Sequence, residues 1–188
     1  SESDKIADFF ELANSEIELR KDLFAEYAGS YNDYIQNSGR KLPLKIFVVN
    51  NYDSFSETYA NYADKIQFLF RDGAKYGVTF IITCIGVNTL RAKVREYFAN
   101  HISLVCANKD DYFSLFDNYK RNTEPAAFKG RGLVEIDKEV LEFQSALIYS
   151  RAEMNNIIKS TGEQLAEKYK DVALKAIPSV PDFVNVEA

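Results

Sequence analysis

Three short apolar runs, at residues 44–50, 78–84 and 102–106, constrain the fold of this chain more than any other feature of its sequence. The second run is rich in β-branched residues and shows no alternation of apolar and polar side chains. Strands without alternation are typical of parallel sheets that helices cover on both faces, so we expect buried strands here. Helical patterns separate the three runs, and this order predicts an α/β fold with a parallel sheet flanked by helices.

Apolar residues that recur at three- and four-residue steps predict the helices. The longest pattern covers residues 4–27, with Ser3 as its N-cap. Further helices are expected at residues 31–36, 61–72 with an irregular start near 54, 89–98, 110–117 and 152–171. A hairpin is expected over residues 133–136 and 140–148, turned by Asp137 and Lys138.

Composition narrows the range of functions. The formal net charge is −5 and no dense basic stripe is present, which argues against a nucleic-acid partner. Cys84 and Cys106 form no close motif, so we expect free thiols, no metal site and a reducing cytosolic setting. No apolar run reaches the length of a membrane span, so a soluble polypeptide is expected, and the start at Ser1 leaves room for a membrane-anchored parent.

The ends of the predicted strands are the first places to look for a site, because α/β folds bind ligands at the carboxyl ends of their strands. The first strand ends at Asn50 and Asn51, whose amides can hydrogen-bond but carry no charge to bind Mg²⁺ and cannot take a proton. Asp53 is the nearest acid, and a role for it as a substitute metal ligand stays open. The alternative that residues 50–53 form only a strand-to-loop turn, which Asn and Asp favour, also stays open.

Three stretches, taken in order, resemble a known family. The first is residues 42–53. The second is residues 71–83, in which Gly73 and Gly77 precede the apolar run that starts at residue 78. The third combines residues 99–104, 110–112 and 130–133. Together they resemble the FtsK/SpoIIIE class of ring-forming ATPases, and within that class they are most similar to type VII secretion translocases of the EssC kind. The resemblance covers most of the chain.

The resemblance implies a RecA-like P-loop ATPase fold of three layers with a C-terminal β-hairpin. No Gly-x-x-x-x-Gly-Lys-Ser/Thr motif occurs in the chain. Residues 1–175 would therefore be the C-terminal part of one ATPase module, and residues 176–188 an extended tail or linker. The P-loop strand, absent from this chain, would lie between the strands ending at Cys84 and Cys106, which places these cysteines too far apart for a disulfide.

The chain departs from the family at its catalytic positions. Asn50 and Asn51 occupy the places of the Walker B Asp and Glu, Ala74 that of an arginine, and Ile85 that of a frequent Gln. The strand-end sensor positions of the family correspond to Thr83, Cys84 and Ile85. These departures imply a degenerate module without catalytic residues, which takes ATP as a ligand with Mg²⁺ weak or absent and acts as a regulatory or substrate-docking platform.

The resemblance also implies partners and a location. The partners are other ATPase modules of the same translocase, joined as a ring oligomer in the parent, and small helical secreted substrates, with no nucleic acid. The chain would be a cytoplasmic domain of a membrane-anchored protein. Candidate contacts between modules are Arg71, Arg91, Arg95 and Arg131. A solvated face is the alternative for Arg91 and Arg95, and Arg131, flanked by glycines, is expected in a turn.

Two other functions stay open at this stage. One is an active ATPase motor module whose acids come from elsewhere, such as Asp53 or an adjacent subunit. The other is a DNA translocase module, against which the negative net charge weighs. The aromatic residues after the first strand are expected to pack in the core, with a peptide-docking surface as the alternative, and they are Tyr52, Phe55, Tyr59 and Tyr62.

Overall fold

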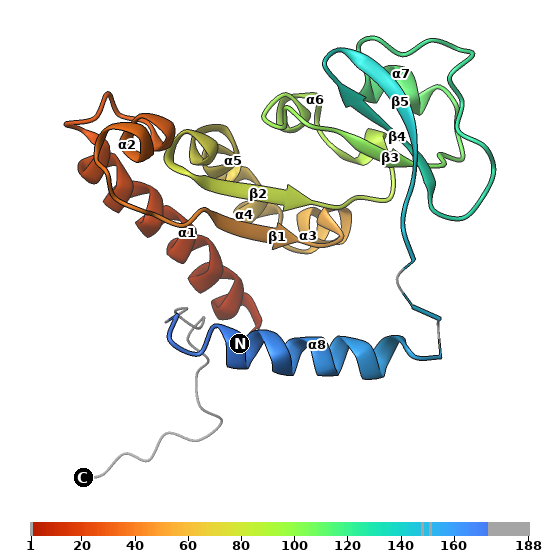
Figure 1. Cartoon of the computed structure of the whole chain (residues 1–188). Helices are drawn as coiled ribbons and strands as arrows, with labels where there is room; N and C mark the ends of the chain where they lie inside the picture. Colours follow the sequence, from red (N-terminus) through yellow and green to blue (C-terminus); the bar gives the residue numbers. More distant parts are fainter. Residues whose placement is uncertain (1, 148, 151, 173–188) are drawn as a thin grey trace. The chain divides into compact units, whose positions relative to one another are not determined.

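The computed structural model describes residues 2–147, 149, 150 and 152–172. These residues form two compact units, 2–100 and 101–172, each with its own small sheet (Figure 1). The assignment of residues 1–175 to one ATPase module remains a prediction. The tail expected at residues 176–188 lies outside the described residues.

The first unit contains a parallel pair of strands among helices, which confirms the α/β prediction for this part of the chain. Strands β1 (Lys45–Val49) and β2 (Val78–Ile82) pair in parallel, with Lys45 opposite Val78 and Val49 opposite Ile82. The other elements, in chain order, are α1 (Glu2–Phe24), α2 (Tyr31–Asn37), α3 (Tyr52–Thr58), α4 (Ala60–Lys65), α5 (Gln67–Gly73), η1 (Ala74–Tyr76), η2 (Val87–Thr89) and α6 (Ala92–Arg95).

Several helix boundaries differ from the predictions. Helix α1 already begins at Glu2, so Ser3 lies inside it and is not the N-cap. The helical stretch expected over 61–72, with an irregular start near 54, is divided at Tyr59 and Ile66 into the three short helices α3, α4 and α5. The helix expected over 89–98 shrinks to η2 and the four residues of α6.

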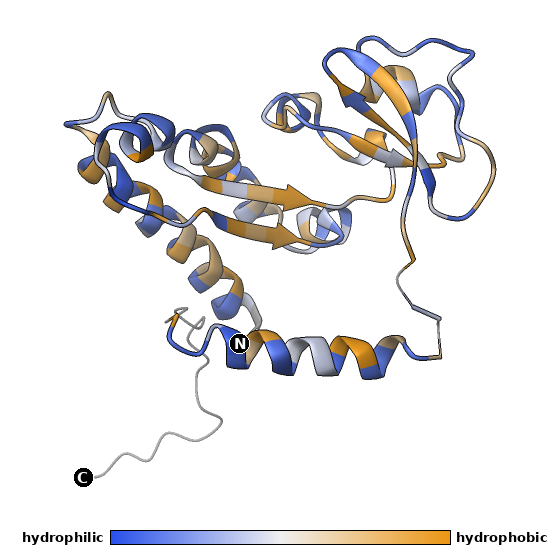
Figure 2. Ribbon diagram, in the orientation of Figure 1, coloured by the Kyte–Doolittle hydropathy of each residue, from blue (hydrophilic) through white to orange (hydrophobic). Residues whose placement is uncertain are grey.

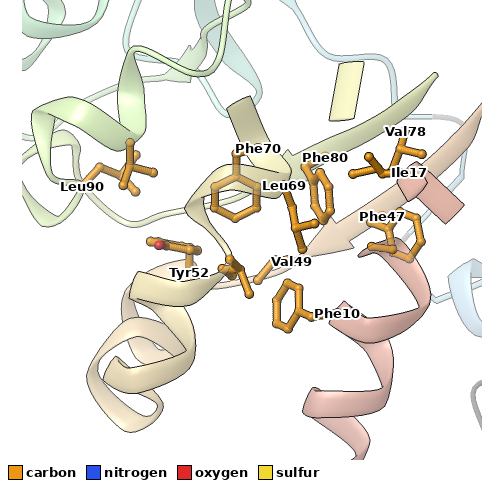
Figure 3. Packing of buried hydrophobic residues seen from close by; sticks show 13 residues of the cluster. Phe10, Ile17, Phe47, Val49, Tyr52, Leu69, Phe70, Val78, Phe80 and Leu90 are labelled. Atoms are coloured by element: carbon orange, nitrogen blue, oxygen red, sulfur yellow. The ribbon is translucent and has the colours of Figure 1, made fainter. Parts of the chain in front are cut away.

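One face of the β1–β2 pair is packed and the other is open. Phe47, Val49, Val78 and Phe80 point into a core that α1 and α5 complete, as Figure 3 shows. On the opposite face, Ile46 is 60% exposed, Val48 56% and Ile81 48%. The prediction of strands buried on both faces is therefore wrong for the described residues, although both strands are mainly apolar, with Lys45 and Thr79 as the exceptions (Figure 2). No described element covers the second face, so its apolar side chains remain exposed. Burial depends on what packs against a strand as well as on the strand's own side chains.

Arg20 joins α1 to the starts of both strands. Its guanidinium is completely buried, pairs with Glu16 at 2.7 Å, and donates to the carbonyl oxygen of Pro43 at 2.7 Å. The same group donates to the carbonyl oxygens of Tyr76 and Gly77, at 3.0 and 3.1 Å. Since these carbonyls precede β1 and β2, one side chain fixes where both strands begin.

Gly73 closes α5 directly against β2. A Cβ atom at this position would lie 2.4 Å from the carbonyl oxygen of Val78, a backbone atom that cannot move aside. We expect Gly73→Ala to lower the free energy of unfolding by about 1–3 kcal/mol, the usual effect of overpacking, as measured by urea denaturation of the chain. The matched control is Gly162→Ala on α8, where nothing lies within 4 Å of the added methyl group. The control should not lower the stability, and equal losses in both variants would contradict the prediction.

The second unit is an antiparallel sheet with two helices. Strands β3 (Ile102–Leu104), β4 (Arg131–Ile136) and β5 (Glu139–Gln144) pair in the order β3-β4-β5. Helix α7 (Asp111–Leu115) packs its Tyr112 in the core of the unit, and α8 (Met154–Lys168) has no buried residue. The predicted hairpin is confirmed, since Asp137 and Lys138 turn it with φ values of 50° and 67°.

The third apolar run was predicted as a buried parallel strand, and this prediction is wrong. β3 pairs only with β4, and it pairs antiparallel. Ile102 and Leu104 are 69% and 58% exposed, with Ser103 alone buried between them. Among the described residues, β2 and β3 each have a single strand partner, so each keeps one edge without a neighbour. The strand that the resemblance places between them remains a prediction. No helix in the described part of the chain is both long enough and apolar enough to cross a membrane.

Candidate functional site

The parallel register brings the ends of β1 and β2 together. The Thr83 N–H donates to the carbonyl oxygen of Val49 at 3.1 Å, and the Tyr52 N–H donates to the carbonyl oxygen of Thr83 at 2.7 Å. Asn50 and Asn51 leave the sheet between these two bonds. The predicted site residues at the two strand ends are therefore neighbours.

The Thr83 hydroxyl connects the two strand ends. It accepts a hydrogen bond from the Asn51 N–H at 2.9 Å and donates one to Oδ1 of Asn50 at 2.7 Å. A threonine hydroxyl offers one proton and two lone pairs. The bond to Asn50 uses the proton, and the bond from Asn51 uses one lone pair. The sequence marked Thr83 as a sensor position, but the bridge itself depends on the strand register.

Asn51 begins α3 in a left-handed conformation, with φ 57° and ψ 62°. Asn tolerates this conformation better than most residues because its short side chain bonds locally. Its Oδ1 accepts a longer contact of 3.4 Å from the Ser54 N–H and so caps the helix. The alternative of a strand-to-loop turn at residues 50–53 thus has local support, and the turn and the strand-end site occupy the same residues.

Asp53 points inward. Its side chain is only 7% exposed, and Oδ2 accepts a hydrogen bond from the Ile85 N–H at 2.5 Å, which ties the loop after β2 to α3. Its Oδ1 is buried without a hydrogen-bond partner. Partial burial raises the pKa of the Cys84 thiol, and the charge of Asp53 raises it further. A buried carboxylate held by a backbone N–H is poorly placed to serve as a metal ligand, which disfavours Asp53 as a substitute acid.

The other two sensor positions are at the surface. Cys84 is a free, exposed thiol that follows β2, and Cys106 is a free, half-buried thiol that follows β3, so the prediction of free cysteines is confirmed. Neither residue lies within a strand, contrary to expectation, because both strands end two residues earlier. Ile85 is 88% exposed, and its backbone rather than its side chain has the structural role.

Beside Tyr52 lies a small pocket that the sequence did not reveal. Its volume is about 100 Å³, and its wall includes Tyr52, Ala60, Ala63, Thr89, Arg91 and Val94. Burial raises the pKa of the Tyr52 hydroxyl, while the charge of Arg91 opposes the shift. Tyr52 lies in the core of the first unit and Phe55 packs against it, as predicted, whereas Tyr59 and Tyr62 are only half-buried. The small side chains of α4 that open the pocket gave no recognisable pattern in the sequence.

The structure pairs three of the four candidate arginines with carboxylates. Arg71 forms a bidentate contact with Asp72 at 2.7 and 2.8 Å, and Arg91 lies 2.5 Å from Asp64 at the edge of the pocket. Arg131 begins β4, so its predicted place in a turn is wrong, and it lies 3.6 Å from Glu142. Arg95 ends α6 and is half-buried. Local ion pairs therefore account for the positions of Arg71 and Arg91 as well as contacts between modules would.

The donor set at the strand ends does not fit a divalent cation. Mg²⁺ prefers anionic oxygens, and the only carboxylate there, Asp53, is turned inward. The Oδ1 atom of Asn50 is already bonded to Thr83, and that of Asn51 to Ser54. Across the described ranges, no group of three or more Cys, His, Asp or Glu side chains could hold a metal ion.

Sequence comparison finds relatives over almost the whole chain. No protein-family model matches it. The chain is 27% identical over 190 residues to the ESX secretion system protein YukB of Bacillus subtilis strain 168, with 98% of the chain and 12% of the relative covered. It is 24% identical over 192 residues to the type VII secretion system protein EssC of Staphylococcus aureus strain MRSA252, with 99% and 13% covered. The chain therefore spans about an eighth of the length of these relatives.

Comparison with solved structures finds ATPase domains of the same secretion proteins. EssC (ATPases 2 and 3) from Geobacillus thermodenitrificans superposes with a TM-score of 0.83 at 25% identity, covering 99% of this chain and 36% of that one. Thermomonospora curvata EccC (ATPases 2 and 3) in complex with a signal sequence peptide has a TM-score of 0.77 at 18% identity, covering 98% and 34%, and shares the fold. The chain is a homologue of the EssC/EccC type VII secretion ATPases and matches a C-terminal ATPase domain of these proteins.

Proposed function

We propose that this chain is the C-terminal part of a degenerate, FtsK/SpoIIIE-type ATPase module that binds ATP but hydrolyses little or none of it. The observation that carries the proposal is the pair Asn50 and Asn51 at the end of β1, with both side-chain oxygens engaged locally. Neither amide can act as a general base, and neither supplies a charge for Mg²⁺. A bound nucleotide would then act as a structural or regulatory ligand.

The module would belong to a longer, membrane-anchored translocase and would lie in its cytoplasmic part. One support is that the chain covers only 12–13% of the length of its relatives. The other is its similarity to a structure described as the cytoplasmic domain of EssC, at a TM-score of 0.67 and 25% identity. Its partners would be the other ATPase modules of that protein, arranged in a ring. The P-loop strand would come from residues outside this chain and would use the edges of β2 and β3 that lack a neighbour among the described residues.

Docking of small helical secreted substrates is the second part of the proposal. The pocket beside Tyr52 could take one side chain of a helix, since Ala60 and Ala63 leave room there, and its wall also carries polar side chains such as Ser56 and Gln67. The related EccC structure was solved with a signal sequence peptide, which supports a peptide-binding role for this class of domain. The alternative of an active motor is disfavoured by the inward-facing Asp53, and a DNA translocase by the net charge of −5.

Nucleotide retention tests the proposal. The full-length protein is purified with the P-loop lysines of its other ATPase modules replaced, incubated with ATP and desalted, and the bound nucleotide is identified by chromatography. We expect intact ATP in about equimolar amount, because phosphate-cradling backbone groups supply binding without hydrolysis. Replacing the P-loop lysine of this module as well should remove the bound ATP. Finding no nucleotide, or finding ADP in place of ATP, would contradict the proposal.

A further inference from the structure

We infer that the apolar side of helix α8 is a docking face, and that the part of the same ATPase module which carries the P-loop covers it. This inference rests on the proposed function, because it takes the chain as the C-terminal part of such a module. It adds an interaction surface, the residues that form it and the chemistry of the surface that fits it.

Helix α8 has little to stabilise it within the described residues. Its N-cap position makes no side-chain hydrogen bond, none of its 15 residues is buried, and Gly162 stands near its middle. Glycine is a poor helix former, and isolated helices of up to about 15 residues are marginal in water. In proteins, such a helix is stabilised mainly by packing of its apolar face. We therefore expect α8 to need a packing partner.

The side chains of α8 define one apolar face. A helix turns by about 100° per residue, so Met154, Ile158 and Leu165 lie within about 40° of one another around its axis. Ile158 is 60% exposed and Leu165 49%. Tyr169 and Val172, which follow the helix, are 49% and 56% exposed. Apolar side chains that gather in this way on a protein surface commonly mark an interaction site.

A second copy of α8 fits this face poorly. Ile158, Leu165 and Val172 are spaced seven residues apart, like one seam position of a coiled coil. The other seam position would then fall at Thr161 and Lys168, where a two-helix coil needs apolar side chains. A symmetrical pair of these helices would bury hydroxyl and ammonium groups, which is unfavourable without partners for them. An apolar surface built from other elements fits the face better.

The solved relatives contain additional polypeptide that can supply such a surface. The superposition on EssC (ATPases 2 and 3) covers 99% of this chain but only 36% of that one, so α8 is matched while most of the relative lies outside the match. Under the proposed function, the P-loop part of the module belongs to the residues outside this chain. Contacts between domains are more polar than the core of one domain, so the apolar face of α8 favours a partner within its own module.

Site-specific photocrosslinking tests the inference in the full-length protein. The photoreactive residue p-benzoylphenylalanine replaces Ile158, and the crosslinked peptides are identified by mass spectrometry after irradiation. We expect crosslinks to the P-loop part of the same module. The matched control carries the same residue in place of the exposed Glu163. It should give at least about tenfold less crosslinked product, because five residues of helix turn it by about 140° away from Ile158.

Hydrogen exchange provides a second measurement. The backbone amides of α8 should exchange at least about a hundredfold more slowly in the full-length protein than in the 188-residue chain, because packing suppresses local opening. Ile158→Gln/Leu165→Gln should remove most of this difference by speeding exchange in the full-length protein alone. Lys159→Gln/Glu163→Gln, which keeps the net charge and changes the polar side of the helix, should leave exchange in both proteins unaltered.

Four results would overturn the inference: no crosslink from position 158, crosslinks from it to another module, to a second copy or to the sheets of this chain, equal crosslinking from position 163, or equal exchange of α8 in both proteins. None of these measurements depends on a bound nucleotide. Retained ATP together with any of these results would overturn only the inference. Crosslinks to the P-loop part without retained ATP would overturn only the proposed function.

Discussion

The double variant Asn50→Asp/Asn51→Glu should hydrolyse ATP faster than the unchanged protein, by about ten- to a hundredfold. An Asp at position 50 would supply the charge that Mg²⁺ requires, and a Glu at position 51 could polarise the attacking water. One preorganised electrostatic group is typically worth about 10²–10³ in rate, and the gain should be partial because Ala74 and Ile85 also depart from the family pattern. Phosphate release by the full-length protein, with the P-loop lysines of its other ATPase modules replaced, measures the effect.

The control for this experiment is Asn32→Asp/Gln36→Glu. It adds the same two negative charges, through one Asn→Asp and one Gln→Glu change, on the exposed surface of α2. The hydrolysis rate of the control should match that of the unchanged protein. Our interpretation would be wrong if the unchanged protein already showed multiple turnovers that persist in Asp53→Ala and disappear without the P-loop lysine of this module. In that case Asn50 and Asn51 would suffice for catalysis.

Arg20→Met should be the most destabilising single change in the first unit. It removes a completely buried cation and leaves Glu16 and the carbonyl oxygens of Pro43, Tyr76 and Gly77 without their donor. Breaking a buried pair by removing one partner typically costs about 3–5 kcal/mol. We expect a loss of this size in the free energy of unfolding, measured by urea denaturation of the 188-residue chain.

Lys21→Met provides the matched control at the next position. Its ammonium group pairs with Glu18 at 2.6 Å, and the two side chains are 38% and 57% exposed. Exposed pairs are worth about 0–1 kcal/mol, so this variant should change stability little. Similar losses for Arg20→Met and Lys21→Met would show that the Arg20 contacts do not hold α1 to the strands.

Sequence patterns predicted most elements because they reflect local backbone preferences. The parallel strands at 45–49 and 78–82, the helix from Tyr31 and the turn at Asp137 and Lys138 all follow from residues close in sequence. Helix ends were less predictable. The split of the helical stretch after β1 at Tyr59 and Ile66 arises from packing around the sheet, which no local pattern records.

The burial of the strands differs most from what their sequences predict. Ile46, Val48 and Ile81 are apolar, yet their face of the sheet is open in the described residues. A sequence states how apolar a side chain is, while its burial also depends on which element covers it. β3 shows the same limit, because its antiparallel pairing with β4 depends on residues about 30 positions away.

By itself, the sequence determined the element order and the chemical character of the strand end, since Asn50 and Asn51 place two uncharged amides there. Only the tertiary structure decided which atoms of those amides remain available. Thr83 lies 33 positions after Asn50, and only the parallel register brings its hydroxyl within 2.7 Å of Oδ1. The same register places the Ile85 N–H on Asp53 and turns that carboxylate inward. Hydrogen bonds between distant residues depend on how the strands align, and local sequence patterns do not contain that information.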